Sequence, residues 1–339
     1  MKMLARKVEA KILLAGVDVT ADISKYLRGL TYEDKESGEA DTLQIELMDK
    51  DKLFIGAWMP KRGDTLEAEL LRKNFEGDGR TERLPLGVFE IDEVENSFPP
   101  SICRIKAVSI SQNSYLRQHN YSKSWENVKL SEIAQEIASA AGLELIYQAA
   151  DDPPINRAEQ GESSTLAFLE KICADNGLAL KVSDGKLILF DETDLEKQDT
   201  VKTFDRNSST ILHFDGKATI NEVYGKAEVS YRHGKHAEQY TATFEAPDKT
   251  SEKVLRINQR VDSQAAAEKL ARKKLREKNK DEIKISLVVL GDFALVAGNC
   301  VELKNCGFYD GKYLIEKANH QIDSGYKVRL EIRKCLNGY

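Results

Sequence analysis

The side chains best able to do chemistry in this sequence are its five histidines and its paired carboxylates. His233 and His236 stand close enough to share a metal ion, but two histidines alone do not complete the three or four ligands that a metal site needs. His119, His213 and His320 fall in separate predicted elements. We therefore interpret the histidine pair as a solvated turn and predict no metal site.

Asp151 and Asp152 are followed by Pro153 and Pro154, a combination that predicts a rigid surface loop. Glycosidase chemistry needs two separately placed carboxyls, and a chain with 56 acidic residues offers many such pairs by chance. The sequence has no Gly-x-Ser-x-Gly elbow and no nucleotide-binding glycine pattern. We predict no catalytic residue, no cofactor and no enzymatic activity.

The cysteines give no disulfide or zinc pattern, because they are five in number and widely scattered. Cys103 falls in a strand pattern and Cys173 on the apolar face of a helix. Both are therefore predicted to be small buried hydrophobic residues. Cys300, Cys306 and Cys335 add no paired spacing.

The formal net charge of −6 argues against a protein built mainly to bind nucleic acid. One helix after Ser263 is nevertheless rich in basic residues, namely Lys269, Arg272, Lys273, Lys274, Arg276, Lys278 and Lys280. We interpret this run as a solvated face, with subunit contact as the second reading and DNA as the third. No stretch approaches the ~20 apolar residues of a membrane helix, so synthesis in a cytoplasm is expected.

Three regions follow from the periodicity. Residues 1–113 alternate as strands and predict a β domain, interrupted by one short helix at 51–59. Residues 114–197 have the apolar periodicity of two helices, the first beginning at Ser131, and a hairpin turn at Ser183-Asp184-Gly185. Together these features predict a small α+β module. Residues 198–339 return to strands, with one helix near 263–280.

The first and third regions share a short pattern. Gly63-Asp64-Thr65-Leu66-Glu67 and Gly298-Asn299-Cys300-Val301-Glu302 both place glycine, a small polar residue, an apolar residue and an acid at a strand start. Gly87 and Gly311 then open a second matching strand in each region. We predict an α+β, mostly β fold in which two related antiparallel β-barrels flank the module, with Gly63, Gly87, Gly298 and Gly311 as repeated turn positions.

The order of these parts resembles the late control D family of phage tail proteins. The most specific fragments begin with Trp125-Glu126-Asn127-Val128 and Leu130-Ser131-Glu132-Ile133-Ala134, and continue with Glu159-Gln160, Ser164-Thr165-Leu166-Ala167-Phe168-Leu169 and Asn176-Gly177-Leu178. The segment Asp310-Gly311-Lys312-Tyr313, with His320 and Gly325-Tyr326, is similar to the terminal barrel of that family. The resemblance covers most of the chain.

The resemblance implies a structural baseplate hub of a contractile phage tail or a phage-derived injection system. Such a hub is a homotrimer that joins the sixfold tail tube protein to a threefold central spike protein and contacts other baseplate proteins. Two related barrels per chain would let three subunits match a sixfold ring. Some members carry an additional enzymatic domain, and none is expected here.

A second hypothesis comes from another class of protein. Residues 121–143 resemble a LysM repeat, which implies a peptidoglycan-binding, tail-associated module. A duplicated barrel favours the hub, because wall binding has no need of two related barrels.

Overall fold

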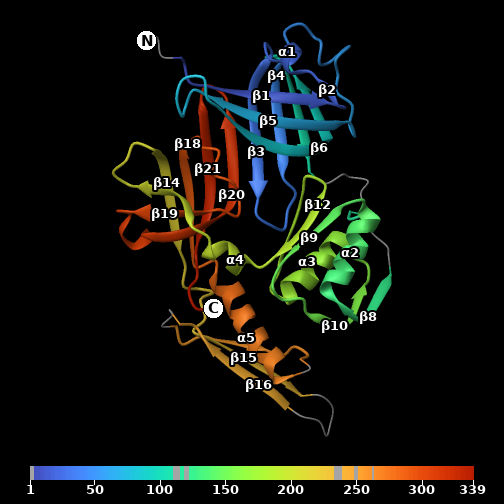
Figure 1. The fold of residues 1–339 in the computed structure, drawn as a ribbon, viewed down its shortest axis with the longest axis vertical. Helices are drawn as coiled ribbons and strands as arrows, with labels where there is room; N and C mark the ends of the chain where they lie inside the picture. The colour runs from blue at the N-terminus through green and yellow to red at the C-terminus, as the bar shows by residue number, and fades with distance from the viewer. Residues whose placement is uncertain (1–3, 110–114, 118–121, 233–238, 248–250, 262) are drawn as a thin grey trace.

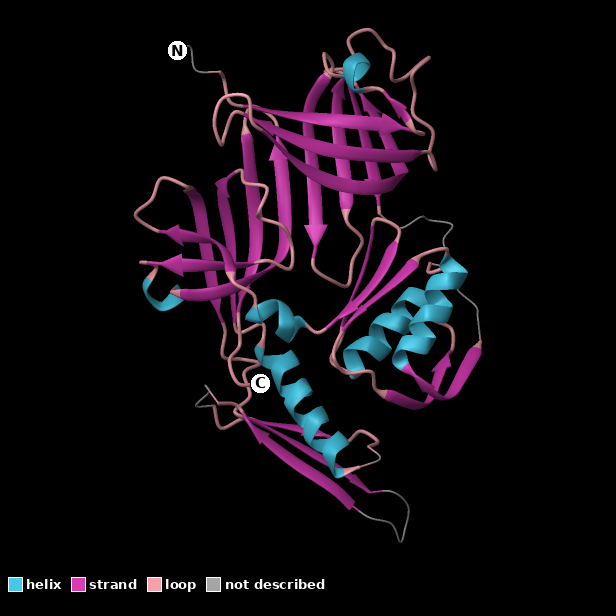
Figure 2. Cartoon of the chain, viewed as in Figure 1, coloured by secondary structure: helices cyan, strands magenta, loops and turns pink. Residues whose placement is uncertain are grey.

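The computed structural model describes residues 4–109, 115–117, 122–232, 239–247, 251–261 and 263–339 (Figures 1 and 2). Strands dominate the described chain, and the longer helices gather in the lower half of the view. The predicted mostly β, α+β fold class is confirmed. No helix among the described residues has the length and apolar character needed to cross a membrane.

The first region is a curved antiparallel sheet. Its elements are β1 (Lys7–Leu14), β2 (Val17–Asp18), α1 (Thr20–Ile23), β3 (Leu27–Lys35), β4 (Thr42–Met48), β5 (Thr65–Lys73), β6 (Thr81–Ser97) and β7 (Ile102–Val108). The strands lie in the order β3-β4-β7-β6-β5-β1-β2. Alternate residues such as Leu43, Ile45 and Leu47 point inward and are buried, as the period of two requires.

The helix predicted at 51–59 is wrong, because this segment forms turns. The Asp49 carboxylate accepts hydrogen bonds from the backbone N–H groups of Phe54 and Ile55, both at 3.1 Å. Such side-chain acceptors compete with helical hydrogen bonds. Phe54 is thereby held in the core of the sheet.

The second region is a compact α+β module with its own core. It contains β8 (Lys123–Lys129), α2 (Leu130–Ala141), β9 (Glu144–Gln148), β10 (Pro154–Gln160), α3 (Thr165–Asp175), β11 (Ala179–Ser183) and β12 (Lys186–Phe190). Ser164 caps α3 by accepting a hydrogen bond from the Ala167 N–H, and Gly142 ends α2 with φ +70°. A short helix, α4 (Glu192–Lys197), leads out of the module.

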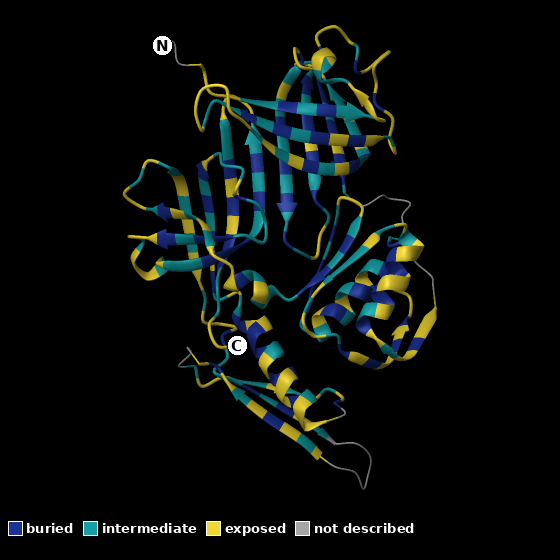
Figure 3. Cartoon of the chain, viewed as in Figure 1, coloured by how far each residue is buried: buried dark blue, intermediate teal, exposed yellow. Residues whose placement is uncertain are grey.

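The third region resumes the strands. Its elements are β13 (Thr200–Asp205), β14 (Ile211–Ala218), β15 (Lys226–Arg232), β16 (Gln239–Glu245), β17 (Val254–Ile257), α5 (Gln264–Asn279), β18 (Ile283–Leu290), β19 (Cys300–Lys304), η1 (Gly307–Tyr309), β20 (Gly311–Ile322) and β21 (Tyr326–Lys334). Strands β15, β16 and β17 form a separate sheet that packs against α5 around its own core. Figure 3 shows the opposite face of this sheet exposed along β16. The sequence did not predict this small fourth unit.

The two predicted barrels are not closed by strand pairing. Instead, β20 pairs with β3 over Lys317–Ile322 and Leu30–Lys35, which joins the first and third regions into one 13-stranded sheet. Figure 1 shows this sheet running from β14 at one end, through β20 and β3, to the strands of the first region. Two barrel-like halves therefore share one backbone hydrogen-bond network.

Candidate functional site

Of the four glycines predicted as turn positions, Gly63 and Gly298 lie in turns, whereas Gly87 lies inside β6 and Gly311 is the first residue of β20. Gly63 and Gly298 both have φ +88°, a conformation that favours glycine. The Gly63 N–H donates to the Ile91 carbonyl at 2.8 Å, and the Gly298 N–H donates to the Ile315 carbonyl at 2.9 Å. Each glycine thus fixes the start of a strand against its neighbour in the same way.

The strand register after these glycines is the same in both halves. In the first half Ala68 of β5 lies opposite Gly87 of β6, and in the second Leu303 of β19 lies opposite Gly311 of β20. A bulge follows at the same distance in each, next to Ile91 in β6 and next to Ile315 in β20.

This agreement extends over five strands. The order β3-β4-β7-β6-β5 in the first half corresponds to β14-β18-β21-β20-β19 in the second. The bulge between Leu27 and Gly29 in β3 matches the bulge between Ile211 and His213 in β14. The halves differ in the next strand, because β1 pairs with β5 antiparallel, whereas β13 pairs with β19 parallel.

Gly87 and Gly311 have φ +95° and +132°, but their surroundings differ. A Cβ on Gly87 would lie 3.6 Å from Asp184, at the tip of the module's β11–β12 hairpin. A Cβ on Gly311 would lie 3.6 Å from the end of the Lys334 side chain. Gly87 therefore lies against the module, whereas Gly311 does not.

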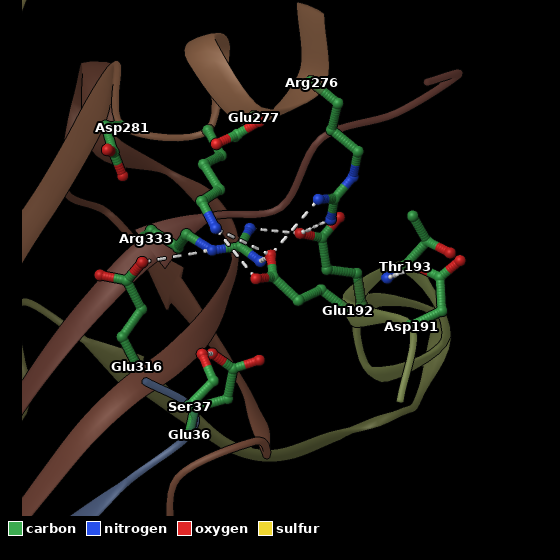
Figure 4. Close-up of polar contacts among 12 residues, drawn as sticks. Glu36, Ser37, Asp191, Glu192, Thr193, Arg276, Glu277, Asp281, Glu316 and Arg333 are labelled. Atoms are coloured by element: carbon green, nitrogen blue, oxygen red, sulfur yellow. Dashed lines mark hydrogen bonds and ion pairs between the residues drawn. The ribbon is translucent and has the colours of Figure 1, made fainter. Parts of the chain in front are cut away.

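A buried ionic cluster joins the parts below the sheet (Figure 4). Arg333 of β21 is fully buried and forms ion pairs with Glu192 at 2.8 Å and with Glu196, both on α4. Arg276 of α5 binds Glu196 at 2.6 Å, and Lys280 binds Glu192 at 2.9 Å. The cluster therefore fastens α4 and α5 to the second half of the sheet.

The cluster shifts the pKa values of its two carboxyl groups Glu192 and Glu36 in opposite directions. Burial raises the pKa of Glu192, but Lys280 and Arg333 outweigh it and hold that pKa at about 2. Glu36, just after β3, lies at the edge of the same cluster, and its Oε1 is buried without a hydrogen-bond partner among the described residues. Burial, and then the neighbouring Glu192, raise the pKa of Glu36 to about 7.

A second ionic contact joins the module to the sheet. Lys181 of β11 forms ion pairs with Asp34 and Asp41, and the Ser183 hydroxyl donates to Asp41 at 2.8 Å. Asp34 also accepts a 2.8 Å hydrogen bond from the Ala297 N–H in the second half of the sheet. One buried carboxylate thus contacts all three regions.

These clusters correct the interpretation of the basic run as a solvated face. Arg276 is buried, and Lys280 has only a quarter of its side chain exposed. Lys273 is mostly buried as well, and burial followed by the charge of Lys269 lowers its pKa to about 8. Part of this basic run therefore contacts other regions of the same chain and does not face solvent.

The fragments that carried the family resemblance build the core of the module. Trp125 stacks on Phe168 with ring centroids 5.1 Å apart and an interplanar angle of 13°. The buried Gln160 amide donates to the Thr165 hydroxyl at 3.1 Å. Their spacing is explained by packing and capping, without any requirement for catalysis.

The two histidines in the described part of the chain, His213 and His320, lie on different strands. His320 is fully buried, with its ring nitrogens 2.7 Å from the Tyr326 hydroxyl and 3.0 Å from the Leu295 carbonyl, and burial lowers its pKa to about 4. His213 is exposed on β14, while His119, His233 and His236 lie outside the described residues. Within the described ranges, no group of three or more His, Cys, Asp or Glu side chains could hold a metal ion.

The fold is that of a phage tail protein. The structure of the 43 kDa tail protein of prophage MuSo2 from Shewanella oneidensis superposes with a TM-score of 0.73 at 13% identity, covering 97% of this chain and 99% of that one. At this identity the likeness concerns the fold.

The chain belongs to the YQBQ-like family, whose profile matches residues 101–333. Two curated relatives, from Escherichia phages P2 and 186, are each named probable baseplate hub protein and are 30% and 28% identical over 180 residues. The predicted resemblance to baseplate hub proteins is thereby confirmed. Each match covers 53% of this chain and 44% of the relative, so this chain matches less than half of their length.

Proposed function

We propose that this chain is a structural baseplate hub protein of a phage or phage-like tail. Its trimer would join the sixfold tail tube protein to the threefold central spike protein and contact other baseplate proteins. The relatives named as baseplate hub proteins and the tail-protein fold support this role. Assembly in a bacterial cytoplasm and a final place in the tail baseplate follow from the same proposal.

The observation that carries the proposal is the repeated five-strand unit. Its register and its bulges agree between the two halves of one chain, which we interpret as an internal duplication. Three chains in a closed ring would present six similar units to the tube and three equal positions to the spike. This matching needs related surfaces and no catalytic group.

The direct test is the solution mass of the purified protein, measured by light scattering with and without the candidate spike protein. A trimer in either condition supports the hub. A persistent dimer, or a monomer that ignores the spike, contradicts it.

Retention on purified peptidoglycan separates the hub from the wall-binding alternative. We expect little retention, because residues 123–141 form β8 and α2, whose apolar faces are used within the module core. Strong retention that chitooligosaccharides compete away would favour the alternative.

A further inference from the structure

Besides the outer edges of β1 and β13, the sheet has an unpaired edge on β6 in the first half and on β14 in the second. In β6, residues Glu93–Ser97 pair with β7 on one side, and no other described strand lies along their second side. In β14, Ile211–Ala218 pair with β18, and the second side again has no strand partner among the described residues. Figure 1 shows β14 on the left of the joined sheet and β6 on its right.

The repeat shows what should cover these edges. The strand corresponding to β6 is β20, and its matching residues from Lys317 onward pair with β3. The strand corresponding to β14 is β3 itself. By the repeat, the pairing of β20 with β3 within the chain is equivalent to a pairing of β6 with β14. That second pairing does not form within a single chain.

We propose that β6 of one copy pairs antiparallel with β14 of a second copy, in the register that β20 and β3 use within the chain. In this register Glu93 lies opposite Thr219, Glu95 opposite Lys217, and Ser97 opposite Asp215. The contact is head-to-tail, so it generates a closed ring if the rotation between copies permits. The inference rests on the proposed trimer and specifies its interface.

Charge supports this register. Within the chain, Lys317 of β20 forms a 3.0 Å ion pair with Glu33 of β3. The corresponding positions in the proposed contact hold Glu93 and Lys217, an opposite pair with its signs exchanged. Both residues are exposed, and neither has an ion-pair partner in the described parts of the chain.

The surroundings of each edge leave room for the incoming strand. A hollow of about 930 Å³ lies at the start of the β6 edge and is lined by residues 59–63 and 90–94. On β14, the Gly216 carbonyl accepts a hydrogen bond from the Tyr309 hydroxyl at 3.0 Å. A carbonyl oxygen has a second lone pair, so this bond still allows a strand N–H to donate.

Cysteine cross-linking tests the contact and its register. Glu95→Cys and Lys217→Cys proteins are prepared separately, mixed and mildly oxidised. Directly opposed antiparallel residues have Cα atoms about 4.5–5.5 Å apart, which a disulfide can span. We expect a covalent dimer in the mixture, and none from either variant alone or from wild type, which controls for the native cysteines. A mixture of Ser97→Cys and Thr219→Cys, which are out of register, is the matched control.

Charge exchange is the second readout. Glu93→Lys or Lys217→Glu alone should raise the dissociation constant of the assembly by about fivefold or more, because opposed like charges destabilise paired strands. Mixing the two variants cannot relieve the repulsion at every interface of a trimer. The double variant should restore part of the association, because position 93 again lies near an opposite charge, while Glu95 still lies opposite a carboxylate at position 217. Circular dichroism checks that each variant folds.

The outcomes separate the interface from the hub. A wild-type trimer whose Glu95→Cys and Lys217→Cys variants give no mixed cross-link, or whose out-of-register pair cross-links equally well, overturns the strand pairing and leaves the trimer standing. A protein that stays monomeric at all concentrations and with the spike overturns both. The expected cross-link together with partial rescue by the double variant establishes the interface.

Discussion

Glu36 makes the ionic cluster sensitive to pH, and Glu36→Gln should remove that sensitivity. The carboxyl is 6% exposed, and its hydrogen-bond partner is the Ser37 hydroxyl at 3.0 Å, while Oε1 lacks a partner among the described residues. The groups facing it are Glu192 on α4, Lys280 just after α5 and Arg333 on β21. Burial and Glu192 prevail, so the pKa rises from 4.5 to about 7.

The sign follows from proton binding. Below pH 4.5 the carboxyl is protonated in both the folded and the unfolded chain, so it costs nothing. Between pH 4.5 and about 7 the folded chain holds a proton that the unfolded chain releases, and the free energy of unfolding falls as pH rises. Each unit of pKa shift corresponds to about 1.4 kcal/mol, so the full loss is about 3 kcal/mol.

Urea unfolding followed by circular dichroism, from about pH 4.5 to about pH 8, measures this loss. We expect Glu36→Gln to be about 2–3 kcal/mol more stable than wild type at about pH 8 and nearly equal at about pH 4.5. Glu39→Gln is the matched control, because that side chain lies on the same hairpin but is 71% exposed. Wild-type and Glu36→Gln stability curves that stay parallel over this range would show that Glu36 does not carry a raised pKa in the folded chain.

Three further substitutions test the cluster and the repeat. Arg333→Leu should lower the free energy of unfolding by about 3–5 kcal/mol, because it leaves Glu192 and Glu196 buried beside a missing partner; a loss under about 1 kcal/mol in urea unfolding would contradict this assignment. Gly63→Ala and Gly298→Ala should each cost about 1 kcal/mol, because both glycines have φ +88° and a Cβ would meet no close contact at either. Unfolding costs that differ by more than about 2 kcal/mol would mean that the two turns are not equivalent.

Local patterns predicted much of the fold. Gly63 and Gly298 were predictable as turn residues because a positive φ just before a strand favours glycine, and each glycine precedes an alternating strand pattern in the sequence. Helices α2 and α3 were also predictable from their apolar stripes and caps. In each case the signal lies within a few residues of the feature.

Long-range contacts left no such signal. The joining of β20 to β3 uses backbone hydrogen bonds, which any side chain permits, so two separate barrels were expected where one sheet exists. The ionic cluster was missed because Glu192, Arg276 and Arg333 come from separate elements, and Arg333 continues an ordinary alternating strand. The one hint was the i, i+4 spacing of Glu192 and Glu196 on α4, which places both carboxylates on one helix face.

The trimeric hub is tested most directly by the solution mass of the wild-type protein, measured by light scattering over a concentration series and with the spike protein added. We expect a trimer of three 38.1 kDa chains, about 114 kDa before any bound spike is counted. A species that remains at one or two chains under every condition would contradict it.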